Sequence, residues 1–313
     1  MSSLVINHVM SQDIQSGILD SFIHYLSEHS PDKHVVTLAP MAAADVHHYH
    51  RPHLEKRLLK NSVTTVHHDL GENDPWLPLI TFLARYKECQ RVVCLNQGQS
   101  NLLREHRIKG VTVVPHGYHD DIFSSPKHRR HSAKKKLTLA LISKRYGRRV
   151  KGESYFQELV KRLDQRFVDF ILVGDGRQVE HQFLSQLGFD SRLYERLPYR
   201  VFGDLYREID LLLMLSLYEG GPANVPEAMA SNVPVAGFSV GMVPDWIEDN
   251  ENGLILSGNV DKDAARIMVL AQDPKQYQSL FLNTVAHALT LPSWRRVGEH
   301  YQRVYREVVE EVA

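Results

Sequence analysis

Cysteine is scarce in this sequence, which contains only Cys89 and Cys94 among its 313 residues. Their spacing fits neither a C-x-x-C redox or zinc motif nor a disulfide framework, so we expect two reduced and packed thiols. Long apolar runs are absent as well. None reaches the roughly 18 residues that a membrane-spanning helix requires, and the segment MSSLVINHVMSQD lacks the basic start and apolar stretch of a signal peptide. We therefore expect a cytoplasmic protein.

An excess of charge of either sign is also missing, because 37 Lys and Arg residues balance 37 Asp and Glu residues. A balanced chain has no global field that attracts nucleic acid, so we expect no nucleic-acid partner, and local groups must bind any anionic ligand. The apolar fraction of 43% and the charged fraction of 24% are typical of a folded globular protein. At 313 residues the chain exceeds what one core usually supports, which favours two domains.

Short β-rich runs alternate with helical patterns along the chain. The first series of strands comprises SLVINHV, HVVTLA, SVTTVHH, RVVCL and VTVVP. The second series begins after Lys136 and comprises LTLALIS, DFILVGDG, LLLMLS, VPVAGF and GLIL. Strands that alternate with helices form parallel sheets, so the sequence predicts an α/β protein with two Rossmann-like domains.

The basic, polar stretch SSPKHRRHSAKKK, residues 124–136, separates the two series and has no apolar periodicity. It predicts an interdomain linker. We place an N-terminal domain at 1–133 and a C-terminal domain at 137–295. A solvated linker is the simpler interpretation of the charge run, and a weak peripheral contact with anionic lipid is the alternative.

The most informative stretch is residues 216–244, SLYEGGPANVPEAMASNVPVAGFSVGMVP, where an apolar strand leads into a glycine-containing turn and a helix. Gly220 and Gly221 allow the backbone to approach a ligand closely. Asn224 is the expected N-cap, and Pro226 suits the first helical turn. Because amides at a helix start attract anions, a diphosphate can lie there without a metal. An ordinary connection with two solvated glutamates is the alternative.

A cluster of cations follows the first strand of the second series, in residues 143–152, SKRYGRRVKG. The carboxyl edge of an open α/β sheet is where ligands bind. Arginine offers bidentate donors and lysine a mobile point charge, so the cluster suits a diphosphate. A solvated basic turn is the alternative.

These motifs resemble those of the retaining glycosyltransferases of family 4. Glu219 and Glu227, in EGGPANVPEAMA, resemble the paired glutamates of that family, and RRVKG resembles its phosphate-binding turn, with Lys151 the clearest equivalent and Arg145 its partner. The resemblance implies the GT-B fold, in which two Rossmann-like domains face a central cleft. It also implies that a C-terminal helix, residues 296–313, crosses back to the N-terminal domain.

The same resemblance implies a function. A hexose-type sugar would pass from a nucleoside-diphosphate sugar to a hydroxyl of a saccharide or lipid-linked acceptor, with retention of configuration and without a metal or other cofactor. Bacterial surface glycoconjugates such as lipopolysaccharide or capsule, made at the inner face of the membrane, are the expected products. The alternatives are a catalytically silent nucleotide-sugar-binding scaffold and a sugar-nucleotide epimerase or phosphorylase of the same fold.

The resemblance further implies roles for individual residues. Glu227 would accept hydrogen bonds from the ribose hydroxyls of the donor, and Glu219 would face the donor sugar near its reacting carbon. Arg145 and Lys151 would neutralise the charge that develops on the departing diphosphate. The other expected donor-binding residues lie in the same motif or in the region that meets the base: Gly220, Gly221, Ala223, Asn224, Tyr199 and Arg200.

Two histidines and a glycine complete the expected site. SVTTVHHDL places His67 and His68 where the family has a catalytic strand-end histidine before an aspartate, and the sequence does not separate them. An imidazole with a pKa near neutrality can bind the donor sugar or orient the acceptor. A histidine at the edge of the core is the alternative. The first loop, SQDIQSGIL, contributes Gly17 to the donor site but contains less glycine than the family's first loop.

The segment DVHHYHRPH contains His47, His48, His50 and His53. Imidazoles close in sequence can share a zinc or nickel ion. This spacing does not define a tetrahedral site, so we expect no metal there. We predict a solvated loop that faces the cleft and contacts the acceptor.

Overall fold

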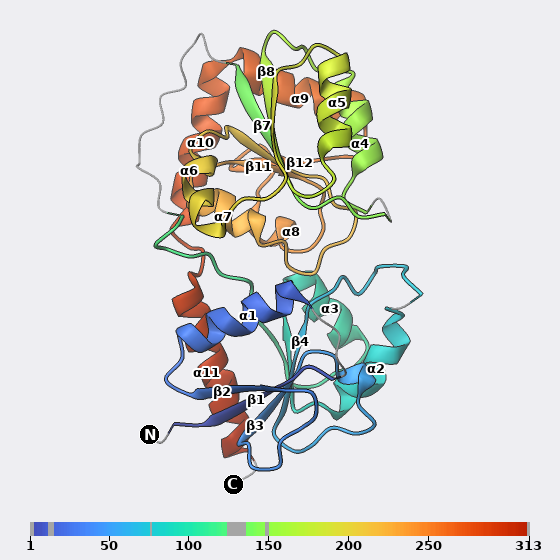
Figure 1. Cartoon of the computed structure of the whole chain (residues 1–313), viewed down its shortest axis with the longest axis vertical. Coiled ribbons are helices and arrows are strands. Elements are labelled where there is room, and N and C mark those ends of the chain that lie inside the picture. Colours follow the sequence, from blue (N-terminus) through green and yellow to red (C-terminus); the bar gives the residue numbers. More distant parts are fainter. Residues whose placement is uncertain (1–2, 12–15, 76, 124–135, 148–149, 312–313) are drawn as a thin grey trace. The chain divides into compact units, whose positions relative to one another are not determined.

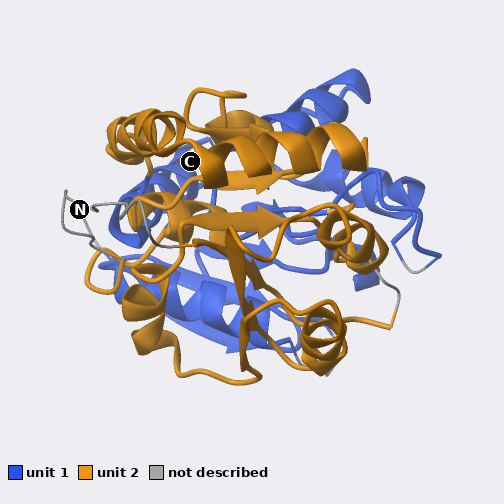
Figure 2. Ribbon diagram, turned by 90° about the horizontal axis from the view of Figure 1, so that it is seen from above, with its two compact units in different colours: residues 1–117, 219–222, 292–313 blue, residues 118–218, 223–291 orange. Residues whose placement is uncertain are grey.

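A computed structural model of the chain describes residues 3–11, 16–75, 77–123, 136–147 and 150–311. Nearly all of the predicted linker, residues 124–135, and two cations of the basic turn, Arg148 and Arg149, lie outside these ranges. The chain divides into two compact units (Figure 2). Unit 1 comprises residues 1–117, 219–222 and 292–313, and unit 2 comprises residues 118–218 and 223–291.

Unit 1 is built on a six-stranded sheet whose neighbouring strands are all parallel, in the order β2-β1-β3-β4-β5-β6. The strands are β1 (Val5–Val9), β2 (Lys33–Thr37), β3 (Val46–Tyr49), β4 (Ser62–Val66), β5 (Arg91–Cys94) and β6 (Val111–Val113). The helices are α1 (Gly17–Glu28), η1 (Pro52–Leu54), α2 (Leu79–Glu88), α3 (Gln97–Glu105) and α11 (Trp294–Glu310).

Helices pack against the sheet of unit 1 (Figure 1), and two apolar clusters join these helices to the sheet. One contains buried residues of α1 and α11, including Phe22 and Tyr301, and the other contains residues of α2 and α3, including Phe82. Helix α11 buries residues at helical spacing from Trp294 to Val308, which holds this last segment against the first helix of the same unit.

Unit 2 contains a second parallel sheet of six strands, in the order β12-β11-β10-β7-β8-β9. The strands are β7 (Leu137–Ile142), β8 (Val168–Val173), β9 (Ser191–Tyr194), β10 (Leu211–Met214), β11 (Val235–Gly237) and β12 (Gly253–Ile255). The helices are α4 (Glu153–Val160), α5 (Gln178–Gln186), η2 (Tyr199–Val201), α6 (Phe202–Tyr206), α7 (Asn224–Ala230), α8 (Val243–Trp246), α9 (Val260–Gln272) and α10 (Pro274–Ala288).

Strand order shows where each sheet is suited to bind a ligand. In unit 2 the order reverses between β7 and β10, and in unit 1 it reverses between β1 and β3. Open parallel sheets bind ligands beyond the carboxyl ends of the strands at such a reversal. The prediction of an α/β protein with two Rossmann-like parallel sheets is confirmed. None of the helices in the described ranges combines the length and the apolar character needed to cross a membrane.

Candidate functional site

The basic turn after β7 is held by a network of buried charges. Arg145 donates from Nε to Oε1 of Glu180 at 3.1 Å, and its backbone N–H donates to the carbonyl of Asp175 at 2.9 Å. Arg177 is fully buried and donates to the carbonyl and the hydroxyl of Ser143, at 2.8 and 2.7 Å. These contacts fix the backbone of the turn and the stem of Arg145.

Two buried carboxylates balance Arg177. Its Nη1 lies 3.7 Å from Oε1 of Glu153 and 3.5 Å from Oε2 of Glu180. Burial lowers the pKa of Arg177, and the two carboxylates act in the opposite direction. No local sequence pattern indicates this network, because its members come from the end of β7, the start of α4 and the start of α5.

Gly152 and Val150 bring the basic turn against the end of β10. Gly152 adopts a positive φ of 76°, and a Cβ there would lie 2.1 Å from the carbonyl oxygen of Leu215. The N–H of Leu217 donates to the carbonyl of Val150 at 2.9 Å. Lys151 lies between Val150 and Gly152 in the chain, and its Nζ is 5.7 Å from the centre of the Tyr146 ring. The predicted phosphate-binding turn therefore lies where the strand order of unit 2 reverses.

Glu227 is buried in the first turns of α7 and is hydrogen-bonded to two tyrosines. The hydroxyl of Tyr199 donates to its Oε1 at 2.6 Å, and that of Tyr206 donates to its Oε2 at 3.4 Å. Burial raises the pKa of Glu227 to about 7, although both hydrogen bonds lower it. Tyr199 is one of the predicted donor-binding residues, whereas Tyr206 was not predicted, because only the fold of α6 brings it to this carboxylate.

Asn224 has a different role from the expected one. It is the first residue of α7 rather than its N-cap, a position that Ala223 occupies without a side-chain hydrogen bond. The Asn224 side chain instead donates from Nδ2 to the carbonyl of Ile142 at 3.1 Å, which joins the start of α7 to the end of β7. The expected donor residues Ala223 and Arg200, the latter in η2, are both exposed.

The segment from Glu219 to Pro222 belongs to unit 1, although the strand before it and the helix after it belong to unit 2. The N–H of Glu219 donates to Oδ2 of Asp69 at 3.1 Å, and Nδ2 of Asn96 donates to the carbonyl of Gly220 at 2.7 Å. A Cβ on Gly220 would lie 2.5 Å from the carbonyl oxygen of His67, so this position requires glycine. The two signature glutamates therefore contact different parts of the fold.

His67 and His68 lie on opposite sides of the sheet of unit 1. The His67 ring meets Phe22 at 4.9 Å in an edge-on contact, and the His68 ring lies 4.3 Å from Phe82. Burial lowers the pKa of His67 well below its usual value and that of His68 to about 4. Both rings are therefore neutral near pH 7.

Gly17 is the first residue of α1, and Ser16 caps that helix. A Cβ at Gly17 would meet no atom within 4 Å, so the described structure gives no packing reason for glycine. The residues just before Ser16, positions 12–15, lie outside the described ranges.

The histidine-rich segment is not a solvated loop, so that prediction is wrong. Residues 46–49 form β3, and His47, His48 and His50 are all buried. Polar side chains are tolerated here because they are hydrogen-bonded: His48 contacts the hydroxyl of Tyr305 in α11 at 2.8 Å and that of Thr65 in the neighbouring β4 at 2.9 Å.

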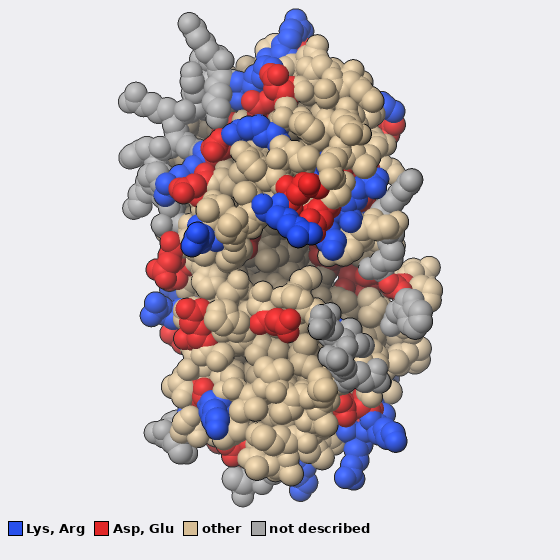
Figure 3. Space-filling model, in the orientation of Figure 1, with Lys and Arg blue, Asp and Glu red and all other residues tan. Residues whose placement is uncertain are grey.

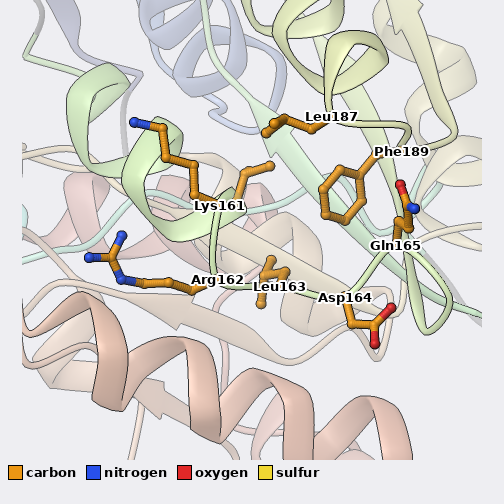
Figure 4. A pocket seen from close by; sticks show the side chains of 8 residues that line it. Lys161, Arg162, Leu163, Asp164, Gln165, Leu187 and Phe189 are labelled. Carbon is orange, nitrogen blue, oxygen red and sulfur yellow. The ribbon is translucent and has the colours of Figure 1, made fainter.

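A surface pocket of about 350 Å³ lies between the end of α4, with Lys161 and Arg162, and the segment after α5, with Leu187 and Phe189 (Figure 4). It contains none of the predicted site residues. On the face shown in Figure 3, cationic and anionic side chains are interspersed, and no large area of one sign is visible among the described residues.

Comparisons with known proteins find a related domain in the second half of the chain. Residues 137–273 match the family model described as "Glycosyl transferases group 1". The chain is similar to the D-inositol 3-phosphate glycosyltransferase of Corynebacterium kroppenstedtii, with 26% identity over 140 residues, which are 44% of this chain and 31% of that protein. It is also similar to the MMP alpha-(1->4)-mannosyltransferase of Mycolicibacterium hassiacum, with 26% identity over 171 residues, 52% of this chain and 42% of that protein. The chain thus matches less than half the length of either relative.

Among solved structures, HepE of Anabaena in complex with UDP and glucose has a TM-score of 0.75, over 97% of this chain and 100% of that chain. The sequence identity is 15%, so this similarity concerns the fold. This similarity supports the two-domain GT-B fold, and residues 137–273 match the model of a glycosyltransferase domain within it.

Proposed function

We propose that the chain is a glycosyltransferase that moves a hexose-type sugar from a nucleoside-diphosphate sugar to a hydroxyl of a saccharide or lipid-linked acceptor. One observation carries the proposal: cations and a buried carboxylate meet the carboxyl ends of β7 and β10, where the strand order reverses. Two hydrogen bonds join these parts, from Asn224 to Ile142 and from Leu217 to Val150.

The donor nucleotide would bind unit 2. Glu227 is an acceptor already directed at two hydroxyl groups, those of Tyr199 and Tyr206, and ribose hydroxyls offer it the same chemistry. Arg145 and Lys151 would take the diphosphate, because a guanidinium and an ammonium group stabilise the charge that develops as the sugar departs. Charge neutralisation by these side chains is the reason why we propose a reaction without a metal.

The sugar and the acceptor would meet residues of unit 1. Glu219, whose backbone is hydrogen-bonded to Asp69, is proposed to face the sugar, and His67 is proposed as the catalytic histidine because Gly220 packs on its carbonyl. Retention of configuration, and a part in the synthesis of bacterial surface glycoconjugates at the inner face of the membrane, are extensions that rest on the resemblance to family 4. UDP is the nucleotide to test first, because HepE was solved with UDP and glucose.

A thermal-shift panel tests the donor site. UDP, GDP, ADP and dTDP are compared, with magnesium and with EDTA, on the wild type, Glu227→Gln and Lys151→Ala. A ligand at about 100 times its Kd stabilises the folded state by about 2.7 kcal/mol, which corresponds to a Tm increase of roughly 5 to 10 °C for a unit of this size.

We expect one diphosphate to raise Tm in EDTA and both variants to lose most of that ligand-induced increase. Lys275→Ala, which removes an exposed lysine of α10, serves as the control and keeps the increase. With donor and acceptor in hand, Lys151→Ala should lower kcat by roughly 100-fold, as loss of a transition-state charge contact does. A wild type that none of the four nucleotides stabilises would contradict the proposal.

A further inference from the structure

Four histidines form a row across the sheet of unit 1. His34 lies in β2 and His8 in β1, while His50 directly follows β3 and His67 directly follows β4. These strands are neighbours in the order β2-β1-β3-β4. Successive ring centres are 5.0, 5.2 and 5.3 Å apart, close to the strand spacing of about 4.8 Å. The sheet itself therefore sets the spacing of the row.

Each ring is hydrogen-bonded to the next through nitrogen. Nδ1 of His34 lies 2.8 Å from Nε2 of His8. Nδ1 of His8 lies 2.9 Å from Nε2 of His50, and Nδ1 of His50 lies 3.0 Å from Nε2 of His67. Every contact joins an Nδ1 to an Nε2, so the row has one direction from end to end.

A neutral imidazole has one N–H donor and one bare nitrogen acceptor. In a row joined head to tail, the tautomer of one ring therefore fixes the tautomer of all four. If every ring carries its proton on Nδ1, Nδ1 of His67 is a donor and Nε2 of His34 is bare. If every ring carries it on Nε2, Nδ1 of His67 is bare and can accept a proton.

The surroundings keep these rings neutral. Burial lowers the pKa of His8, His50 and His67 well below the usual value, and that of His34 to about 4 although Asp32 raises it. The two ends of the row, Nε2 of His34 and Nδ1 of His67, are buried and have no hydrogen-bond partner among the described residues. Because a buried polar atom usually has a partner, both ends are positions where a proton donor or acceptor is expected.

We propose that His34, His8, His50 and His67 form a proton relay that ends at Nδ1 of His67. When this nitrogen takes up a proton, the proton on Nε2 of His67 passes to His50, and the one on Nε2 of His50 passes to His8. The proton on Nε2 of His8 then passes to Nδ1 of His34, and the Nε2 proton of His34, a half-buried residue, is released to water. One proton enters and one leaves, and all four rings are neutral again in the other tautomer.

The catalytic role of this relay rests on the proposed glycosyltransferase function. Transfer forms a bond between the acceptor oxygen and the sugar carbon and breaks the bond between that carbon and the diphosphate oxygen. The acceptor hydroxyl loses one proton in this step, and Nδ1 of His67 takes it. His67 is thus the catalytic residue, and His50, His8 and His34 act through it.

A metal site is the competing interpretation, because ligand atoms of His8, His48 and His50 all lie within 4.8 Å of one another. Two features favour the relay. The His48 and His50 rings stack at 4.4 Å with an interplanar angle of 28°, whereas ligands of one ion point their nitrogens at a common centre. Both nitrogens of His48 are also hydrogen-bonded, to Tyr305 and Thr65.

Nitrogen NMR of the ¹⁵N-histidine-labelled wild type at pH 7 tests the row without any substrate. The relay requires that His34, His8, His50 and His67 show the same fraction of Nδ1–H tautomer. Neighbours with opposite tautomers, or a charged ring within the row, would overturn the proposal. So would stoichiometric binding of added zinc that is lost in His8→Gln.

Steady-state kinetics of His8 variants tests proton movement. His8→Gln keeps a donor and an acceptor in the row, but an amide cannot pass a proton on by changing tautomer, and His8→Phe removes both groups. We expect each to lower kcat by roughly tenfold or more with KM within about twofold, as loss of general acid–base catalysis does. Tyr305→Phe removes the hydroxyl bonded to His48, outside the row, and should leave kcat unchanged.

Each kinetic outcome either supports or overturns proton movement along the row. His8→Gln with wild-type kcat would overturn proton movement, because that variant preserves the hydrogen bonds and blocks only the transfer. A wild type without turnover on any donor would count against the proposed function, and the NMR result would still decide whether the four histidines act as one row.

Discussion

The carboxyl group of Glu227 should make the stability of the protein depend on pH in a direction opposite to that of a typical acidic residue. Its pKa rises from the usual 4.5 to about 7, mainly because the side chain is buried. The folded state therefore binds this proton more tightly than the unfolded chain. The resulting stabilisation is complete below pH 4.5 and is lost as the pH rises to about 7.

The size of the effect follows from the shift in pKa. One unit corresponds to about 1.4 kcal/mol, so the whole shift is worth about 3 kcal/mol, of which roughly 2 to 3 kcal/mol is lost between pH 5 and pH 8. Glu227→Gln removes the titrating group while keeping its volume. Relative to the wild type, the variant should therefore gain about 2 to 3 kcal/mol in its free energy of unfolding over this range.

Urea denaturation at pH 5, 6, 7 and 8, followed by circular dichroism and tryptophan fluorescence, measures the difference. A constant offset between the variant and the wild type reports the altered hydrogen bonds to Tyr199 and Tyr206, and only the change in the offset with pH reports the titration. Glu299→Gln, at an exposed position of α11, is the matched control for exchanging a carboxylate for an amide away from the site. An offset for Glu227→Gln that stays constant from pH 5 to pH 8 would refute the assigned pKa.

Three further predictions concern stability and reactivity. Gly152→Ala should lower the free energy of unfolding by at least about 2 kcal/mol, because the position has a positive φ and the new Cβ would lie 2.1 Å from the carbonyl oxygen of Leu215. Urea denaturation measures the loss, and a change below about 0.5 kcal/mol would contradict the prediction. Arg177→Met should lower the free energy of unfolding by about 3 to 5 kcal/mol, because it removes the guanidinium from the buried carboxylate of Glu153 and leaves Arg145 as the paired cation of Glu180. Urea denaturation measures the loss, and a change below about 1 kcal/mol would contradict this. Burial raises the pKa of Cys89 and Cys94, the latter to about 12. Iodoacetamide should therefore label both thiols far more slowly in the native chain than in the urea-unfolded chain. Mass spectrometry measures the two rates, and equal rates would refute the burial of the thiols.

The alternation of strand and helix patterns was enough to predict ten of the twelve strands in the described residues, all except β3 and β9. The run SVTTVHH contains β4, and DFILVGDG contains β8, because buried parallel strands are short and apolar. The same pattern predicted which residues follow the strands, and these include His67 and Arg145. Residue spacing near a strand end therefore located much of the candidate site before any tertiary contact was known.

What the sequence did not predict depends on contacts between distant segments. Arg177 and Ser143 are far apart in the chain, and no local pattern indicates that one is buried against the other. The strand β3 was missed because histidines occupy two of its four buried positions. Only pairing with neighbouring strands and the hydrogen bond to Tyr305 explain why they are tolerated. The orientation of the two strand-end histidines is a third example. Successive residues of a strand face opposite sides of the sheet, so the order His67-His68 alone does not tell which histidine packs on Phe22 and which on Phe82.

The two signature glutamates show how a short motif can combine two structural roles. Glu227 is buried in unit 2, where tyrosines bind its carboxylate and burial controls its charge. Glu219 belongs to unit 1, where Asp69 binds its backbone and Asn96 holds the next carbonyl. The glycine at position 220 is needed because the chain passes close to the His67 carbonyl there, which is also where the histidine row ends. The spacing of the motif therefore reflects the path of the chain from one unit to the other as much as the chemistry of its carboxylates.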